Sequence, residues 1–343
     1  MLKVTSSSIY LYCYCVSLLL SAFSPAVFAG ALLDPKQNKM VAGFVKKMHA
    51  EHAEIPTTWL KSQFENLQLN QNVLASIQRP AESMNWSRYR KLFITQKRIN
   101  QGAMFMQTHK ATLQHFSKRY GIPAEIVVAI LGVETNYGDT QGSFSALEAL
   151  ATLAFYYVPR HDFFTDELKS LLVTAWHHKW NLKEIKGSYA GALGIPQFMP
   201  SNVDLYARPA IKQSQDVNLF NNKEDAIHSV FHYLKARGSW LAKAPIIRPI
   251  HFSRNGQKIL RNIFKHKKTA SIVVTEEMRQ QLGIRQFKGQ AWILCIIDGD
   301  LRHYYLFRPN FNSIMTYNNS SLYALAVVEL AQKIVSKVKR NEH

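Results

Sequence analysis

The chain has 343 residues, of which 47% are hydrophobic and 12% aromatic, so it can bury a large core and is neither disordered nor collagen-like. Its 42 Lys and Arg against 23 Asp and Glu give a formal net charge of +19, which favours an anionic polymer or surface as partner. Three cysteines, Cys13, Cys15 and Cys295, are too few for a disulfide framework or a cysteine-rich zinc site.

Residues 1–29 have the features of a secretory signal peptide. Lys3 precedes an apolar stretch, and small residues stand three and one positions before a cleavage point at Gly30. A membrane anchor is the alternative, but it needs about 20 apolar residues, and this stretch is shorter. Tyrosines precede both early cysteines where a lipoprotein signal has a small residue. We therefore expect export to the periplasm without lipidation, either as a free form or with peripheral attachment to the membrane, and no nucleic-acid partner.

The remaining chain has the apolar spacing of helices over most of its length. Helices are predicted near residues 41–52, from Thr57 onward, and over 99–120, 123–134, 144–155, 162–178, 223–237 and 322–337. Residues 292–297 and 301–307, joined by Asp298-Gly299, predict one β-hairpin. The fold class is therefore α+β and mainly α, with no internal repeat and no low-complexity linker.

Glu134 is the strongest candidate for a functional acidic residue in the sequence. It ends the helix that runs from Pro123, and residues 126–133 (IVVAILGV) are apolar all round. A carboxylate in such surroundings is poorly solvated, so its pKa should rise, and a protonated Glu can donate to a leaving group. The alternative is a side chain that turns outward as the helix ends.

Three segments resemble the lytic murein transglycosylase B family. They are residues 132–138 (GVETNYG), 187–194 (GSYAGALG) and 197–201 (QFMPS), in this order. The resemblance extends from about residue 40 to 335 and includes 86–90, 93–95, 149–153, 157–160 and 317–320. It implies a lysozyme-like helical core at 121–240, a helical flanking region at 30–120, and a β-hairpin-containing part with the C-terminal helix at 241–343, packed as one unit with the core.

The resemblance also implies roles for single residues. Glu134 matches the catalytic acid/base, and Ser188 and Gln197 match residues that position that Glu and the sugar. Further positions match residues that contact glycan or peptide, namely Tyr89, Arg160, Tyr233, Tyr317, Asn318 and Tyr323.

Members of the family cleave the MurNAc–GlcNAc bond of peptidoglycan without water and leave a 1,6-anhydromuramoyl end. The expected partners are therefore glycan strands and their stem peptides, the protein is expected to be a monomer, and no cofactor is expected. A non-catalytic wall-binding or scaffold protein and a lysozyme-type hydrolase are the alternatives. The intact set of Glu134, Ser188 and Gln197 disfavours the scaffold, and the lack of an evident second carboxylate disfavours the hydrolase.

The sequence departs from the family in two places. Some relatives carry a calcium-binding loop with alternating carboxylates before the 223–237 helix, but residues 207–216 here (ARPAIKQSQD) lack them, so we expect no metal site even though Asp225 remains. Pro159 and Phe163 stand near Arg160 where relatives have a basic residue and a tyrosine, so the contacts to the stem peptide are expected to differ in detail.

Three further residues, Glu224, His228 and His232, have the spacing of a metal-binding helix face. The preferred interpretation is a solvated polar face.

Overall fold

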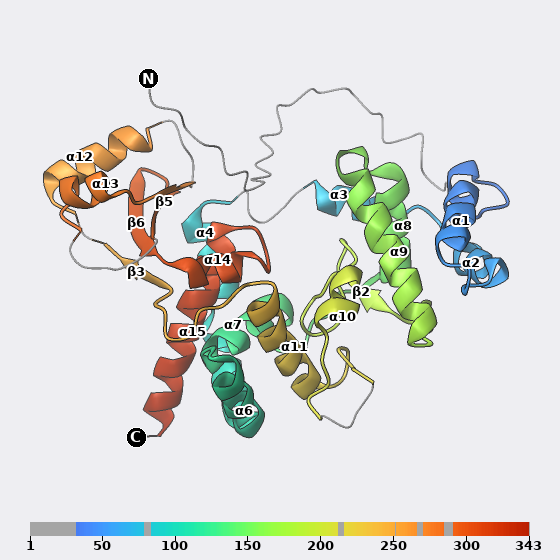
Figure 1. The fold of residues 1–343 in the computed structure, drawn as a ribbon, viewed down its shortest axis with the longest axis horizontal. Coiled ribbons are helices and arrows are strands. Elements are labelled where there is room, and N and C mark those ends of the chain that lie inside the picture. Colours follow the sequence, from blue (N-terminus) through green and yellow to red (C-terminus); the bar gives the residue numbers. More distant parts are fainter. Residues whose placement is uncertain are drawn as a thin grey trace.

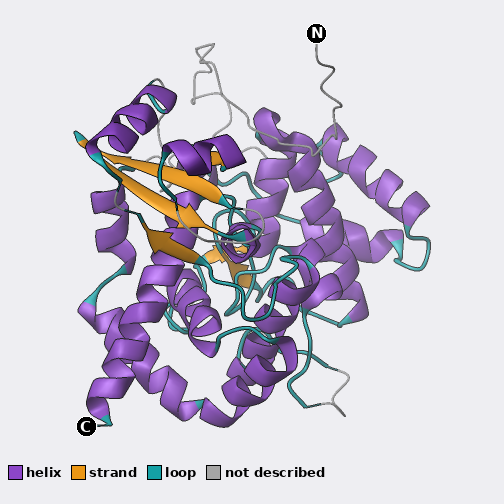
Figure 2. Cartoon of the chain, turned by 60° about the vertical axis from the view of Figure 1, so that its left-hand side comes forward, coloured by secondary structure: helices purple, strands orange, loops and turns teal. Residues whose placement is uncertain are grey.

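The computed structural model describes residues 32–78, 84–211, 216–250, 252–265, 270–284 and 291–342, and the expected signal peptide lies outside these ranges. The described chain is mostly helical with small antiparallel sheets, so the expected α+β, mainly α class is confirmed (Figure 1). The four-stranded sheet lies toward one end of the molecule (Figure 2), whereas the two-residue strands β1 (Phe144–Ser145) and β2 (Lys186–Gly187) pair with each other away from it, where Figure 1 shows β2 beside α10 (Pro200–Tyr206). Within the described residues, no helix combines the length and the hydropathy needed to cross a membrane.

The first hydrophobic cluster surrounds helix α7, Ala124–Thr135. Every residue of α7 from Ile126 to Val133 is buried, which agrees with the unbroken apolar run in the sequence. The other helices of this cluster come from both sides of α7 in the chain: α4 (Trp86–Phe93), α5 (Gln96–Thr108), α6 (Lys110–Tyr120), α11 (Lys223–Ala236), α14 (Pro309–Met315) and α15 (Ser321–Asn341).

The second cluster lies on the other side of the molecule, where Figure 1 shows α1 and α2 beside α8 and α9. Its helices are α1 (Lys39–Glu51), α2 (Thr57–Phe64), α3 (Gln71–Ile77), α8 (Ala146–Tyr156), α9 (His161–His177) and α10 (Pro200–Tyr206). A 3-10 turn, η3 (Val158–Arg160), joins α8 to α9. The residues expected to form one flanking region at 30–120 therefore pack in two different clusters, one before and one after residue 80.

The third cluster belongs to a four-stranded antiparallel sheet with strand order β3-β6-β5-β4. The expected hairpin is confirmed as β5 (Trp292–Asp298) and β6 (Leu301–Phe307), in the register that pairs Asp298 with Leu301. The sequence did not predict the flanking strands β3 (Ile247–Pro249) and β4 (Ala270–Val273), which are only three and four residues long. Helices α12 (Arg254–Ile263) and α13 (Glu276–Gln281) accompany this sheet.

The prediction of one long helix over residues 99–120 is wrong in one respect, because the helix is broken at His109. The backbone of His109 has ψ near 24°, outside the range of a regular helix, and it separates α5 from α6. Its imidazole Nδ1 lies 2.7 Å from a carboxylate oxygen of Glu224, and its ring lies 4.4 Å from that of Phe105. The long-range contact with Glu224 stabilises a break that apolar periodicity does not reveal.

Helix α4 connects the sheet to the helices around α7. The backbone N–H of Ser87 donates to Asp298 over 3.1 Å at the tip of the hairpin, and the Ser87 hydroxyl donates to the same carboxylate. Three residues later, the Arg90 guanidinium forms a two-pronged bond to the Glu329 carboxylate of α15. The sheet is thus fixed to the helical part through polar contacts as well as through packing.

Candidate active site

Glu134 is the next-to-last residue of α7, and its side chain is partly exposed. The helix ends at Asn136, which has the left-handed φ of 51°, and Tyr137 N donates 3.1 Å back to the Leu131 carbonyl. This pattern of bonds is a Schellman-type end that stops the helix abruptly. The turn therefore places a carboxylate at the boundary between an apolar core and solvent.

Tyr323 holds this carboxylate. Its hydroxyl donates to Glu134 Oε1 over 2.6 Å from the first turn of α15, 189 residues later in the chain. Burial and the nearby charge of Glu134 raise the pKa of Tyr323 well above its usual value of 10. The tyrosine therefore keeps its proton over the whole physiological range and acts as a hydrogen-bond donor to the carboxylate.

Tyr317 lies beside this pair. Its ring is nearly parallel to that of Tyr323, with centroids 6.5 Å apart, and its hydroxyl donates to the Pro196 carbonyl over 2.6 Å. Burial and the charge of Glu134 also raise the pKa of Tyr317 well above 10. Tyr317 thus joins the segment before α15 to the glycine-rich loop, and Glu134 lies close enough to affect its titration.

Thr135 fixes the end of α7 to the same loop. Its hydroxyl donates to the Ile195 carbonyl over 2.8 Å and accepts the N–H of Gly138 over 3.0 Å, and the residue is fully buried. The ring of Tyr137 packs so closely on Gly132 that a Cβ there would lie 2.6 Å from the tyrosine oxygen. The family-like segment 132–138 thus combines one partly exposed carboxylate with residues that shape the turn, a division that the sequence did not reveal.

Ser188 lies in the glycine-rich loop and shapes it. Its hydroxyl oxygen accepts the backbone N–H groups of Ala190 and Ala192 over 3.2 and 3.0 Å. Both bonds use oxygen lone pairs, so the hydroxyl hydrogen takes no part in them. The loop also needs glycine at position 191, where φ is +83° and a Cβ would lie 2.4 Å from the Leu150 side chain.

Gln197 adopts the left-handed φ of 51° in the same loop. Its amide nitrogen donates to the carbonyls of Gln141 and Gly194 over 3.1 and 2.8 Å. These two bonds fix the plane of the amide and leave its oxygen as the acceptor atom. Gln141, whose own amide donates to the Phe220 carbonyl over 2.8 Å, is a supporting residue that the sequence analysis did not single out.

Tyr89 and Tyr233 are expected contact residues that the structure buries deeply, with 1% and 3% of their surfaces exposed. Tyr233 donates its hydroxyl to the Thr316 carbonyl over 2.6 Å, and its ring lies 4.9 Å from Tyr317. Tyr89 packs on Phe93 and lies close enough to Tyr323 to affect its titration. Rings so buried cannot stack on a sugar, so both support the tyrosines next to Glu134 instead.

Arg160 and Asn318 lie at the other expected positions. The Arg160 guanidinium lies 4.1 Å from the centroid of the Phe163 ring, so the phenylalanine that replaces the usual tyrosine forms a cation–π contact. Arg160 also lies close enough to Tyr189 of the glycine-rich loop for their charges to interact. Asn318 is half-buried between Tyr317 and α15, and its carbonyl accepts the Ser320 N–H over 2.6 Å.

The next acidic residue after Glu134 is Asp139, which already has partners. Its carboxylate accepts the side-chain amides of Gln101 and Asn136 over 2.9 and 3.1 Å. Glu134 has a tyrosine donor instead of a carboxylate as its described neighbour. Tyr323 therefore gives Glu134 a neutral hydroxyl as a partner, whereas most glycosidases place a second carboxylate close to the first.

The carboxylate near the start of α11 is not placed to bind a calcium ion. Asp225, the carboxylate retained from the family pattern, accepts the backbone N–H of Ala210 with one oxygen and that of Asn218 with the other, over 2.8 and 2.9 Å. Calcium needs six to eight oxygen ligands, and a carboxylate engaged by two N–H donors is a poor one. Within the described ranges, no three His, Cys, Asp or Glu side chains are grouped as metal ligands.

The interpretation of His228 as part of a solvated face is wrong. His228 is 7% exposed, its Nδ1 lies 2.7 Å from the Pro209 carbonyl, its Nε2 lies 2.8 Å from the Tyr120 hydroxyl, and its ring stacks on Phe116 at 3.9 Å. The neutral ring fits these partners, with Nδ1 donating to the carbonyl and Nε2 accepting from the hydroxyl. Glu224, four residues earlier, is paired with His109 instead.

One partly exposed carboxylate at the end of a buried helix, held by a tyrosine and faced by a rigid glycine-rich loop, defines a lysozyme-like carbohydrate-cleaving enzyme. The comparisons with known proteins identify the family. Residues 36–332 match the family described as "Transglycosylase SLT domain". The chain belongs to this family of lytic transglycosylases.

Individual relatives agree with this assignment. The chain is 35% identical to the membrane-bound lytic murein transglycosylase B of Escherichia coli K12, over 89% of this chain and 88% of the relative. Its structure matches the soluble lytic transglycosylase SltB1 of Pseudomonas aeruginosa with a TM-score of 0.77 and 32% identity, covering 87% of this chain and 99% of that one. It also matches P. aeruginosa SltB3, solved with NAG-anhNAM-pentapeptide, with a TM-score of 0.73 and 26% identity, covering 86% and 78%.

Proposed function

We propose that this enzyme cleaves the β-1,4 bond between MurNAc and GlcNAc in peptidoglycan without water, and that Glu134 serves as both acid and base. The observation that carries the proposal is the Glu134 carboxylate itself, held by the Tyr323 hydroxyl at the end of an apolar helix. The relative SltB3, solved with a product-like NAG-anhNAM-pentapeptide, supports the choice of substrate.

In the first step, protonated Glu134 donates its proton to the glycosidic oxygen, and the C1–O bond breaks. The carbonyl oxygen of the substrate's own N-acetyl group bonds to C1 and takes the place of a second enzyme carboxylate. This substrate assistance agrees with the surroundings of Glu134, where the next acid along the chain, Asp139, is bonded to Gln101 and Asn136. Glu134 is ionised at the end of this step.

In the second step, ionised Glu134 takes the proton from the C6 hydroxyl of the same sugar. The C6 oxygen attacks C1, the bond from the N-acetyl oxygen breaks, and a 1,6-anhydro ring forms. The proton taken from C6 leaves Glu134 protonated again, so the enzyme ends in its starting state. Tyr323 stays bonded to the carboxylate throughout and orients it for both transfers.

Ser188 and Gln197 position the sugar in this proposal. Their loop is joined to α7 through Thr135 and to the α15 side through Tyr317, so the acceptor oxygen of Gln197 and the hydroxyl of Ser188 stay in a fixed relation to Glu134. Arg160 and Asn318 extend the contact surface toward the stem peptide. We further propose that the enzyme acts as a monomer in the periplasm, consistent with the signal-peptide features of residues 1–29.

The test is a digestion of purified peptidoglycan with the purified protein, followed by mass spectrometry of the released muropeptides. We expect products one water lighter than those of a hydrolase, since the anhydro ring forms internally. Ordinary reducing ends would identify a hydrolase and contradict the proposal. Tight binding to the wall without any release would favour the scaffold alternative.

A further inference from the structure

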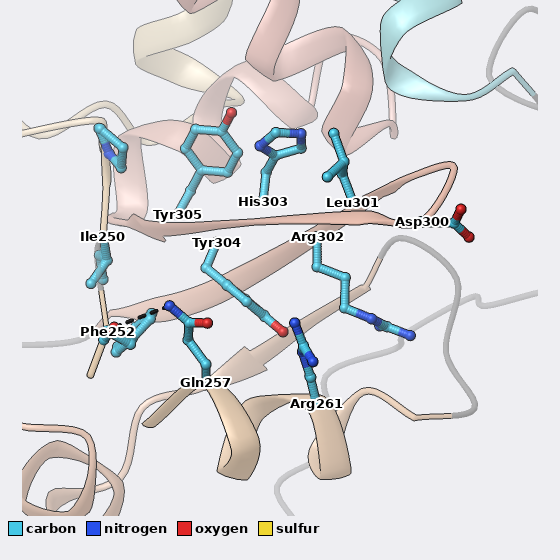
Figure 3. A pocket seen from close by; sticks show the side chains of 11 residues that line it. Ile250, Phe252, Gln257, Arg261, Asp300, Leu301, Arg302, His303, Tyr304 and Tyr305 are labelled. Carbon is cyan, nitrogen blue, oxygen red and sulfur yellow. Dashed lines mark hydrogen bonds between the residues drawn. The ribbon is translucent and has the colours of Figure 1, made fainter. Parts of the chain in front are cut away.

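The part of the chain around the four-stranded sheet is unusually basic. Residues 241–308 contain 13 Lys and Arg against 4 Asp and Glu, although they are a fifth of the chain. Three of these four acids have partners: Asp298 accepts from Ser87, Glu276 pairs with Arg279, and Glu277 accepts from Gln281. The fourth, Asp300, lies at the turn before β6, at the edge of the cavity described next, and Figure 3 shows its carboxylate pointing away from Arg261 and Arg302. The catalytic proposal uses none of this positive charge, so the surface of this part calls for a separate explanation.

A cavity of about 500 Å³ opens between β6 and α12 in this part. Figure 3 shows Arg302 and Tyr304 leaving β6 toward α12, while Leu301, His303 and Tyr305 leave it on the opposite side. Gln257 and Arg261 rise from α12 to meet them. Ile250 and Phe252 form an apolar wall at the other end of the cavity.

Two guanidinium groups face this cavity without a carboxylate partner among the described residues. Arg302 Nη1 donates to the Phe264 carbonyl over 3.3 Å and lies 4.0 Å from the Cys295 sulfur, and both of these partners are neutral. Arg261 is exposed, and no ion pair involves it in the described chain. Asp and Glu are also absent from the sequence of the nearby chain segments that the structure does not describe, namely residues 251, 266–269 and 285–290.

Tyr304 adds an unsatisfied donor at the base of the cavity. Its hydroxyl oxygen is buried and has no well-formed hydrogen bond among the described residues, although the Cys295 thiol lies close enough to interact with it and Arg261 is near. Figure 3 shows the Arg261 side chain ending beside this hydroxyl. A buried hydroxyl without a good acceptor costs stability, and a carboxylate bound in the cavity would offer it one.

The polar groups fit a peptide carboxylate better than a simple anion. Arginine forks pair with carboxylates through two parallel bonds, which Arg261 and Arg302 can both provide. The Gln257 amide nitrogen donates to the Phe252 carbonyl over 3.2 Å, so its oxygen remains to accept a peptide N–H. The apolar wall of Ile250 and Phe252 suits a small side chain such as that of alanine, and the volume is in the range of small-ligand sites.

We propose that the cavity between β6 and α12 binds the terminal carboxylate of a peptidoglycan stem peptide, separately from the strand that is being cut at Glu134. This inference rests on the proposed function for the identity of the peptide. The sheet is fixed to α4 through Ser87 and Asp298, and α4 to α15 through Arg90 and Glu329, so a stem peptide held here keeps the wall beside the catalytic helices. The site would thus retain the enzyme on its polymer between cuts.

The experiment measures binding of a soluble synthetic stem peptide with a free C-terminal carboxylate to the full chain by calorimetry. Arg261→Gln and the double variant Arg261→Gln/Arg302→Gln should weaken binding by about tenfold and more, as expected for lost charge-assisted bonds. The same peptide with a C-terminal carboxamide should bind as weakly to the unaltered protein as the free acid does to the double variant. The matched control is Arg254→Gln/Lys258→Gln, which removes equal charge from the same helix outside the cavity.

Three results would overturn the inference. They are unchanged binding by the double variant, an equal loss in the control variant, and competition by inorganic phosphate as strong as that by the peptide. The single Arg261→Gln change affects an exposed side chain, so it keeps the test valid if the double variant does not fold. Because binding of a free peptide needs no turnover, failure here is distinct from failure of the proposed function, which the release of anhydro products tests.

Discussion

Two loops lie against each other near Glu134, and they are held in different ways. Loop 187–198 is held mainly by its backbone: glycines allow close approach, and Thr135 and Tyr317 bond to its carbonyls. The described parts of the second loop, 207–211 and 216–222, are held by side chains of α11, chiefly Asp225 and His228, which bond to their N–H and carbonyl groups. The Ile195 N–H donates to the Leu219 carbonyl over 2.8 Å and joins the two loops.

The two loops therefore differ in how far their stability depends on titratable groups. The first loop contains no ionisable group in its supporting bonds apart from tyrosines, which keep their protons at neutral pH. The second depends on a carboxylate and an imidazole. Changes of pH should therefore loosen the second loop and leave the first intact, whereas substitutions at Glu134 and its donor should stop the reaction and leave both loops in place.

The largest expected effect is that of Glu134→Gln, which keeps the shape of the side chain and removes its acid/base capacity. Turnover of peptidoglycan should fall by about a thousandfold or more, in the range for loss of an acid/base group, while the affinity for the wall stays close to that of the unaltered protein. A pull-down on insoluble wall measures affinity, and release of soluble muropeptides measures turnover. Near-normal turnover would remove Glu134 from its proposed role.

The next effect concerns the hydrogen bond from Tyr323. Tyr323→Phe removes the hydroxyl that donates to Glu134 Oε1 and keeps the ring, so kcat should fall by about 10- to 100-fold with a smaller change in KM. The matched control is Tyr156→Phe in α8, whose hydroxyl accepts a bond from Asn38 away from this site. An equal loss of activity in both variants would mean that Tyr323 acts only through stability.

A moderate effect is expected from acid on the second loop. Burial lowers the pKa of His228 below its usual value of 6.5 and that of His232 to about 4. The unfolded chain takes up these protons as the pH falls through about 6.5, while the folded chain resists until near pH 4, so stability should fall across this window. Thermal melting from pH 7 to 4 measures the slope.

His232→Gln should reduce that slope, and the same change at the exposed His115 of α6 should leave it unchanged. A slope unaffected by His232→Gln would show that other groups govern acid sensitivity. Hydrogen exchange at pH 5 would locate the change, which we expect at residues 207–210 before residues 188–198.

The smallest expected effect is that of a chelator, which should leave the melting temperature unchanged because Asp225 closes its loop with two N–H donors instead of a calcium ion. Asp225→Asn, in contrast, replaces one acceptor oxygen with a donor that faces an N–H, and should lower the melting temperature by several degrees. A clear drop with chelator alone would contradict the expectation that the protein has no metal site.

Local patterns in the sequence predicted the elements well where one pattern dominated. The apolar run in α7 and the Asp298-Gly299 turn of the hairpin each determine their structure almost alone. Short strands such as β3 and the break at His109 depend on partners far away in the chain, which periodicity does not register. The packing of α1–α3 on α8 and α9 was likewise not evident from their order in the sequence.

The candidate site shows the same limit. Glu134 could be singled out from its place at the end of an apolar helix, but its donor Tyr323 lies 189 residues away, and only the family resemblance connected them. The supporting roles of Thr135 and Gln141 involve bonds to backbone carbonyls, for which side-chain identity gives little signal. The deep burial of Tyr89 and Tyr233 could not be inferred either, because tyrosine is common both in cores and at surfaces.

The central claim is that the bond is cut by the substrate's own C6 hydroxyl and not by water. Digestion of peptidoglycan in water enriched in heavy oxygen tests this claim most directly, with lysozyme digestion as the control. We expect the muropeptides released by this protein to carry no heavy oxygen, because both atoms of the new bond come from the sugar. Heavy oxygen at C1 of the released muramic acid would contradict the account and make the enzyme a hydrolase.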